Sequence, residues 1–157
     1  MINFPIKIDS NWNLNGLEIS DFKSICFYVQ NLPYGRNSSR YHPELVIKEA
    51  KGTCSSKHAF LKMVAEQNGQ SEVKLILCIF KMNHLNTPGI GDVLTDAGME
   101  FMPEAHCYLK IGNDRFDFTN SLSDISKIEK DIILEKEITA DQVAEFKVEF
   151  HQSFQKK

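Results

Sequence analysis

Two stretches of the chain place apolar residues at helical spacing. In the first, the apolar positions fall at i, i+3, i+4 and i+7, and they are Phe22, Ile25, Cys26 and Val29. This pattern predicts an amphipathic helix over residues 20–30, with its apolar stripe, Cys26 included, in the core. Ser20 or Asp21 is suited to cap its start, and Pro33 ends it because proline disfavours helix in the preceding residue.

The second helix is predicted over residues 53–68, where Thr53 is a suitable N-cap and Asn68-Gly69 is typical of a C-terminal stop. Apolar side chains cover about two-thirds of its circumference, so we expect it to be largely buried. Its narrow polar strip consists of Ser55, His58, Lys62 and Glu66. We expect Cys54 in the first turn of this helix, and His58 as a solvated residue that borders a cleft.

Two further stretches predict β-structure. Residues 72–82 are a run of apolar side chains too continuous for a half-exposed strand, which predicts a central strand covered on both faces. Residues 105–111 instead alternate in polarity, stop at Gly112-Asn113 and resume over 114–118, which predicts a β-hairpin.

The other segments complete one predicted domain that spans residues 1–157. We interpret the Pro- and Gly-rich segment 86–92 as a connector, with a lid over a site as the alternative, and the mixed segment 127–136 as structural. From Thr139 onwards, apolar residues at helical spacing predict a closing helix that is capped by Thr139 and docks on the body.

Charge and composition exclude several classes of protein. The net charge is -3 and no cluster of Lys and Arg occurs, so we expect no nucleic-acid partner. No secretory leader and no run long enough to cross a membrane is found, so we expect a cytoplasmic protein without a membrane partner. The four cysteines are dispersed and lack Cys-x-x-Cys spacing, so we expect free thiols and no metal or other cofactor.

The predicted hairpin brings a histidine and an aspartate side chain together. With a two-residue turn at Gly112-Asn113, His106 and Asp117 lie on one face as diagonal neighbours, close enough for one hydrogen bond. A carboxylate bonded to one imidazole nitrogen orients the ring, so that the other nitrogen can accept a proton from a nucleophile. Cys54 is the candidate nucleophile, because the helix N-terminus and a nearby imidazolium both lower the pKa of a thiol.

These residues resemble the transglutaminase-like superfamily. The resemblance rests on Gly52-Thr53-Cys54 at the start of a helix, on His106 followed by an aromatic residue, and on Asp117-Phe118-Thr119, and it extends over residues 22–120. It implies a papain-like α+β core, in which the cysteine-bearing helix packs on an antiparallel sheet. It also implies acyl-enzyme chemistry on an amide, with Cys54, His106 and Asp117 as the catalytic residues.

The expected reaction is attack of the Cys54 thiolate on a carboxamide or peptide bond, followed by transfer of the acyl group to an amine or to water. The substrate is then an amide-bearing protein, peptide or small molecule. The backbone N–H of Cys54 is a candidate oxyanion donor, and Gln30 or Tyr34 is a candidate for the second. A peptidase that uses the same three residues remains an alternative.

Two alternatives come from other classes of protein. Cys54 and His58 are four residues apart on one helix face, and with His106 or His84 they could form a metal site. A binding module that keeps the fold but has lost the chemistry is the second alternative. Arg36 and Arg40 are interpreted as solvated loop cations, with contact to an acidic group of a substrate as the alternative.

Overall fold

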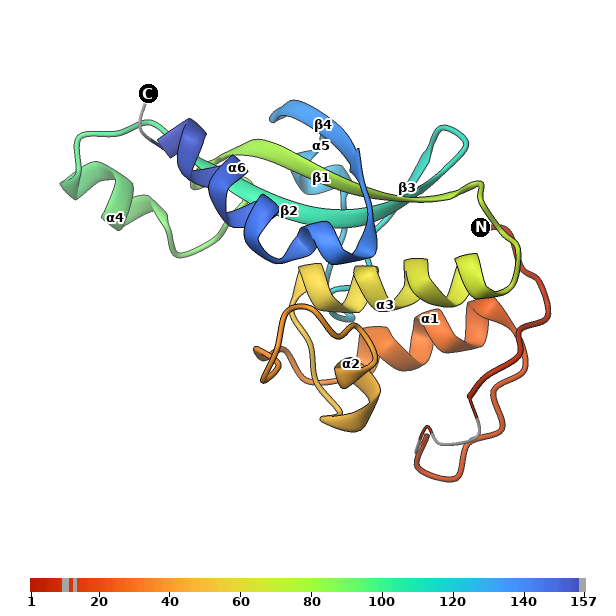
Figure 1. The fold of residues 1–157 in the computed structure, drawn as a ribbon. Coiled ribbons are helices and arrows are strands. Elements are labelled where there is room, and N and C mark those ends of the chain that lie inside the picture. Colours follow the sequence, from red (N-terminus) through yellow and green to blue (C-terminus); the bar gives the residue numbers. More distant parts are fainter. Residues whose placement is uncertain (10–11, 13, 156–157) are drawn as a thin grey trace.

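Three helices form the layer built from the first half of the chain (Figure 1). The computed structural model describes residues 1–9, 12 and 14–155. The helices are α1 (Phe22–Asn31), α2 (Leu45–Lys48) and α3 (Cys54–Gln67). Asp21 caps α1 by accepting a hydrogen bond from the N–H of Ser24, and the chain turns extended at Leu32, before the proline. The first predicted helix is therefore confirmed, with Cys26 fully buried.

Helix α3 begins and ends where its sequence predicts. The side chain of Thr53 accepts from the N–H of Ser56, while the Ser56 side chain binds the N–H of Thr53, which forms a capping box. Asn68 is the C-cap, and Gly69 follows with φ +74°, a conformation that glycine adopts without steric cost. The prediction that His58 is solvated is wrong, because its side chain is fully buried.

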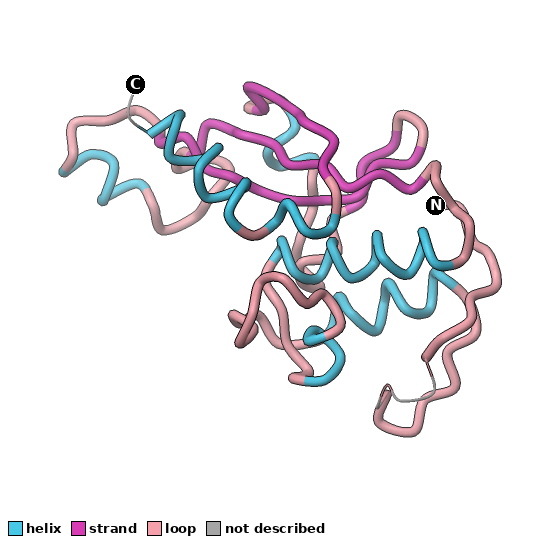
Figure 2. Tube along the Cα trace, in the orientation of Figure 1, coloured by secondary structure: helices cyan, strands magenta, loops and turns pink. Residues whose placement is uncertain are grey.

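The second half of the chain forms a four-stranded antiparallel sheet in the order β3-β2-β1-β4. Its strands are β1 (Val73–Met82), β2 (Met102–Ile111), β3 (Asp114–Phe116) and β4 (Ile132–Ile138). Strand β1 is central, as predicted, and alternate residues of it lie in two different apolar clusters. One face packs on the core shared with α3, and the other faces the short helix α5 (Ser126–Glu129). The fold is therefore α+β, and Figure 2 shows the strands stacked on the helical layer.

The β2–β3 hairpin has the predicted register. Ile111 pairs with Asp114 across the two-residue turn, in which Gly112 has φ +59°. Strand β3 stops at Phe116, so the part of β2 before Leu109 has no paired strand on that side among the described residues. The chain after Phe116 is thus free to turn toward the first turn of α3.

Strand β4 was not foreseen, because segment 127–136 was interpreted only as structural. The strand lies at an edge of the sheet, and only Ile138 among its seven residues is buried. An exposed edge strand needs no clear alternation of polarity, so its sequence gives a weak signal. The segment 86–92 also differs from a plain connector, because helix α4 (Gly91–Asp96) begins within it.

The C-terminal segment contains a 3-10 helix, η1 (Ala140–Val143), followed by α6 (Glu145–Gln155), in place of one continuous helix. Thr139 is the N-cap of η1, as expected, and the break falls at Ala144. Phe146 and Phe150 of α6 stack, and Phe154 lies tilted against Phe150. Lys136 of β4 lies over Phe146 and Phe150, 5.0 and 5.8 Å from their ring centres. The lysine contacts join α6 to β4, and α6 also packs along β2 (Figure 1).

Candidate active site

A pocket of about 410 Å³ opens at the N-terminal end of α3. Three segments line it: the first turn of α3, the loop over residues 34–40, and the exposed side of α6. Glu104 and Ala105 of β2 and Val143 of η1 complete the wall. The described residues of segment 86–92 do not line this pocket, so the pocket gives no support to the lid interpretation.

Cys54 is the first residue of α3 and is only 8% exposed. The Nζ of Lys147, on α6, lies 3.7 Å from its sulfur and donates a 2.6 Å hydrogen bond to the hydroxyl of Ser55. Burial by itself would raise the pKa of the Cys54 thiol. The positive charges of Lys147 and His106 and a hydrogen bond with His106 outweigh burial, so the pKa lies well below its usual value.

His106 and Asp117 form the predicted pair. The Nε2 of His106 is 2.8 Å from Oδ2 of Asp117, and both side chains are largely buried. The other carboxylate oxygen, Oδ1, accepts hydrogen bonds from the backbone N–H and the hydroxyl of Thr119, at 2.9 and 2.5 Å. The carboxylate is therefore fixed from two sides, and Nδ1 is the imidazole nitrogen left to face the thiol.

The electrostatics of the pair favour an imidazolium beside a thiolate. Burial opposes charge on His106, but the Cys54 thiolate and the hydrogen bond with Asp117 outweigh it and raise the pKa of His106 to about 10. Burial would likewise raise the pKa of Asp117, yet the hydrogen bond and charge of His106 hold it well below its usual value. A proton is thus held on the imidazole and not on the sulfur at neutral pH.

His58 links α3 to the segment that carries Asp117 through two hydrogen bonds. Its Nδ1 lies 2.6 Å from the carbonyl oxygen of Cys54, and its Nε2 accepts a 2.8 Å hydrogen bond from the N–H of Phe118. One ring thus joins the first turn of α3 to the residue that follows Asp117. Burial lowers the pKa of His58, which keeps the ring neutral and suited to donate from one nitrogen and accept at the other.

The two predicted oxyanion donors lie in different surroundings. Tyr34 lines the pocket, is 63% exposed, and is close enough to Cys54 for the thiolate charge to act on its phenol. Gln30 does not line the pocket, and its side-chain N–H donates to the carbonyl of Asn120 at 3.2 Å. The helix cap uses the amide of Ser56, and not that of Cys54, which leaves the Cys54 amide as a donor at the helix N-terminus.

Lys147 is the functional residue that the sequence did not indicate. It lies 93 residues after Cys54 in the chain, on a helix whose apolar residues were the only recognisable signal. A lysine on the polar face of an amphipathic helix is normally solvated. Only the docking of α6 along β2 brings this side chain to the thiol.

The residues considered for a metal site are not arranged as one. Both ring nitrogens of His58 have backbone partners, and His84 is exposed and outside the pocket. Over residues 1–9, 12 and 14–155, no group of three or more His, Cys, Asp or Glu side chains is placed to hold a metal ion. No helix in those ranges is long and apolar enough to span a bilayer.

All four cysteines are free and buried. Burial raises the pKa of Cys26 and of Cys78 far above the usual thiol value, and it raises the pKa of Cys107 to about 11. Cys54 alone among the four has a lowered pKa. Neither a family model, nor a curated protein, nor a solved structure matches this chain.

Proposed function

We propose that the protein is a cysteine-dependent acyltransferase or amidase that forms a thioester on Cys54. One observation carries the proposal: the 2.8 Å hydrogen bond between His106 and Asp117, beside a thiol whose pKa the charge of His106 helps to lower. A structural His–Asp pair does not require a thiol at a helix N-terminus beside it. The grouping of all three is what nucleophilic catalysis needs.

In the proposed reaction, the Cys54 thiolate attacks the carbonyl carbon of an amide and forms the C–S bond. The backbone N–H at the start of α3 stabilises the oxyanion that develops. The imidazolium of His106 gives its proton to the nitrogen of the amide as the C–N bond breaks, so ammonia or an amine leaves. Asp117 stabilises the imidazolium and keeps the ring oriented.

The thioester is then resolved by an amine or by water. Neutral His106 takes a proton from the incoming acceptor, which attacks the thioester carbon. The C–S bond breaks, and the electron pair returns to sulfur as the thiolate. A transferase and a peptidase differ here only in the acceptor and in the position of the amide in the substrate, so both belong to the same proposal.

A transglutaminase-like, papain-like architecture agrees with this function. The features that favour it are the cysteine at the start of α3, the packing of α3 on an antiparallel sheet, and the histidine on one strand of a hairpin with the aspartate directly after the other. Because both ring nitrogens of His58 are occupied by backbone groups, the geometry gives no comparable support to a metal-binding function.

The test is acylation by a small neutral ester, p-nitrophenyl acetate, followed by intact-protein and peptide mass spectrometry. We expect one acetyl group on Cys54 that hydroxylamine removes, as a thioester requires. His106→Ala should slow acylation at least a hundredfold, in the range usual for loss of a general base. His84→Ala, which removes an exposed histidine outside the pocket, is the matched control.

A binding module without chemistry predicts a different result. The wild-type thiol would then acetylate no faster than a free cysteine, and His106→Ala would leave the rate unchanged. Either outcome would overturn the proposal. If the acetyl-enzyme forms, a screen of amide donors with and without added amines separates transferase from hydrolase activity.

A further inference from the structure

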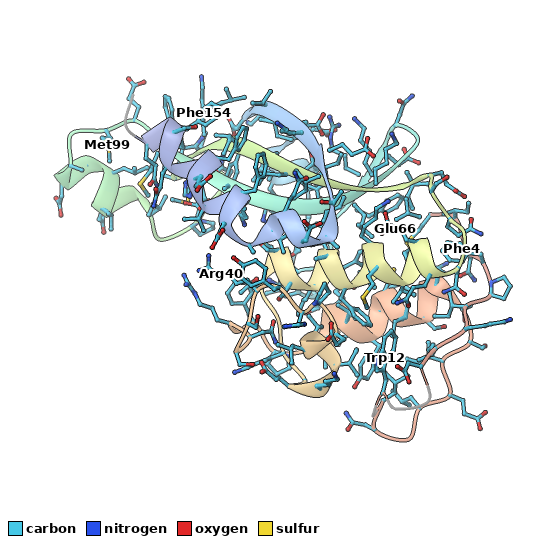
Figure 3. All side chains as sticks on the ribbon, in the orientation of Figure 1. Phe4, Trp12, Arg40, Glu66, Met99 and Phe154 are labelled. Atoms are coloured by element: carbon cyan, nitrogen blue, oxygen red, sulfur yellow. The ribbon has the colours of Figure 1, made fainter. Side chains whose placement is uncertain are left out.

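Positive charge is concentrated in the lining of the Cys54 pocket. Arg36, Arg40 and Lys147 all line it, while Glu104 is the carboxylate among the described lining residues. Figure 3 labels Arg40 on the loop before α2, on the side where the first turn of α3 and α6 meet. The charges of Arg36, Lys147, Glu104 and Cys54 all act on the Tyr34 phenol, so these groups surround a common space.

Two of these cations, Arg36 and Arg40, form no ion pair among the described residues. Lys147 lies against the sulfur of Cys54 and is committed to the thiolate. Arg36 and Arg40 are both exposed. Glu104, which faces His151 at 3.7 Å, is the only lining carboxylate that can oppose them.

The loop that carries both arginines is held in place by Glu49. The Glu49 carboxylate accepts hydrogen bonds from the side chain of Asn37 at 3.0 Å and from the N–H of Ser38 at 3.1 Å. Asn37 also donates to the carbonyl of Lys51 at 3.0 Å. These bonds hold the backbone between the two arginines, so their positions beside the pocket are largely set before any ligand binds.

We propose that Arg36 and Arg40 form an anion-binding subsite, and that the acyl donor carries a negatively charged group, such as a carboxylate, close to its reactive carbonyl. Arginine suits this role because its planar fork of N–H groups matches a carboxylate or phosphate. The inference rests on the proposed function, since it names the class of substrate that would reach Cys54.

A pair of alkylating reagents tests the subsite without knowledge of the substrate. Iodoacetamide and iodoacetate each transfer a two-carbon unit to sulfur with loss of iodide, but iodoacetate carries a carboxylate where iodoacetamide carries a neutral amide. The ratio of their rates at Cys54 reports recognition of the negative charge. The same ratio for Cys54 in the urea-unfolded chain is the reference, because a free thiolate repels the carboxylate.

We expect the folded protein to have a higher iodoacetate-to-iodoacetamide ratio than the unfolded chain. Arg36→Gln and Arg40→Gln should each lower the ratio about threefold, and the double variant about tenfold, which is the range for exposed ion pairs. The iodoacetamide rate should stay unchanged in these variants. Lys23→Gln, which removes the same charge from α1 outside the pocket, should leave the ratio unchanged.

The possible results distinguish failure of the anion subsite from failure of the proposed acyl-transfer function. Fast iodoacetamide labelling with a ratio that both arginine substitutions leave unchanged would overturn the anion subsite and leave the reactive thiol intact. Slow iodoacetamide labelling of the wild type would overturn the proposed function and the subsite with it. A thermal melt of the double variant, matched to wild type, ensures that a lowered ratio reports charge and not unfolding.

Discussion

The proximity of Lys147 to Cys54 makes a quantitative prediction about the thiol. Lys147→Met removes the positive charge while it keeps an unbranched side chain of similar length. The nitrogen it removes lies 3.7 Å from the Cys54 sulfur. We expect the pKa of Cys54 to rise, because the thiolate loses one of the two positive charges that stabilise it.

The magnitude follows from Coulomb's law. Two unit charges 3.7 Å apart interact by about 4 kcal/mol at an effective dielectric constant of about 20, and by about 2 kcal/mol at a value of about 40. The pocket opens to solvent on one side, which places the pair between these values. At about 1.4 kcal/mol for each pKa unit, the expected rise is about 1.5 to 3 units.

The assay is the rate of iodoacetamide labelling of Cys54 as a function of pH, followed by mass spectrometry. The acidic limb of the wild-type profile should move to higher pH by that amount in Lys147→Met. Lys147→Arg keeps the charge and is the matched control, so its profile should remain near that of wild type. An unchanged profile in Lys147→Met, or equal shifts in both variants, would refute the electrostatic argument.

Three further predictions concern the groups around the nucleophile. Asp117→Asn should lower the pKa of His106 from about 10 and slow acylation of the thiol at least tenfold, because the imidazolium loses its carboxylate partner. In a profile of acylation rate against pH, the alkaline limb of this variant should lie at lower pH than that of wild type. His58→Phe should destabilise the fold by about 2 kcal/mol in urea unfolding, because the buried N–H of Phe118 loses its acceptor, and should also slow labelling. Lys57→Met should destabilise the fold by about 2 kcal/mol in the same assay, because buried backbone carbonyls lose their donor.

Short-range features of the fold could be predicted from the sequence. Thr53 and Gly69 act through their own backbone neighbours, so their effect on α3 is visible in the local sequence. The hairpin is also local, because a two-residue turn fixes which residues oppose each other. That pairing predicts His106 close to Asp117 without any knowledge of tertiary packing, although the ladder itself ends one residue before Asp117.

Features that depend on distant packing could not be predicted in the same way. His58 looked solvated because its helix neighbours are polar, yet its partner is the backbone of Phe118, 60 residues away. Lys147 reaches the thiol only through the docking of α6, and β4 is an edge strand with little burial to shape its sequence. In each case the sequence shows the residue type but not the neighbour that gives it a role.

Two side chains of α3 hold Asp117 in position, although strand β3 is only three residues long. Because β3 ends at Phe116, the backbone after it has no sheet partner to hold Asp117 in position. Two consecutive buried side chains take over: His58 receives the N–H of Phe118 at 2.8 Å, and Lys57 donates to the carbonyl of Thr119 at 2.7 Å. Both belong to the helix that begins with the nucleophile, so the separation of thiol and carboxylate is fixed by one helical turn. A substitution that removes the His58 contact should therefore slow labelling of Cys54 more than it destabilises the sheet.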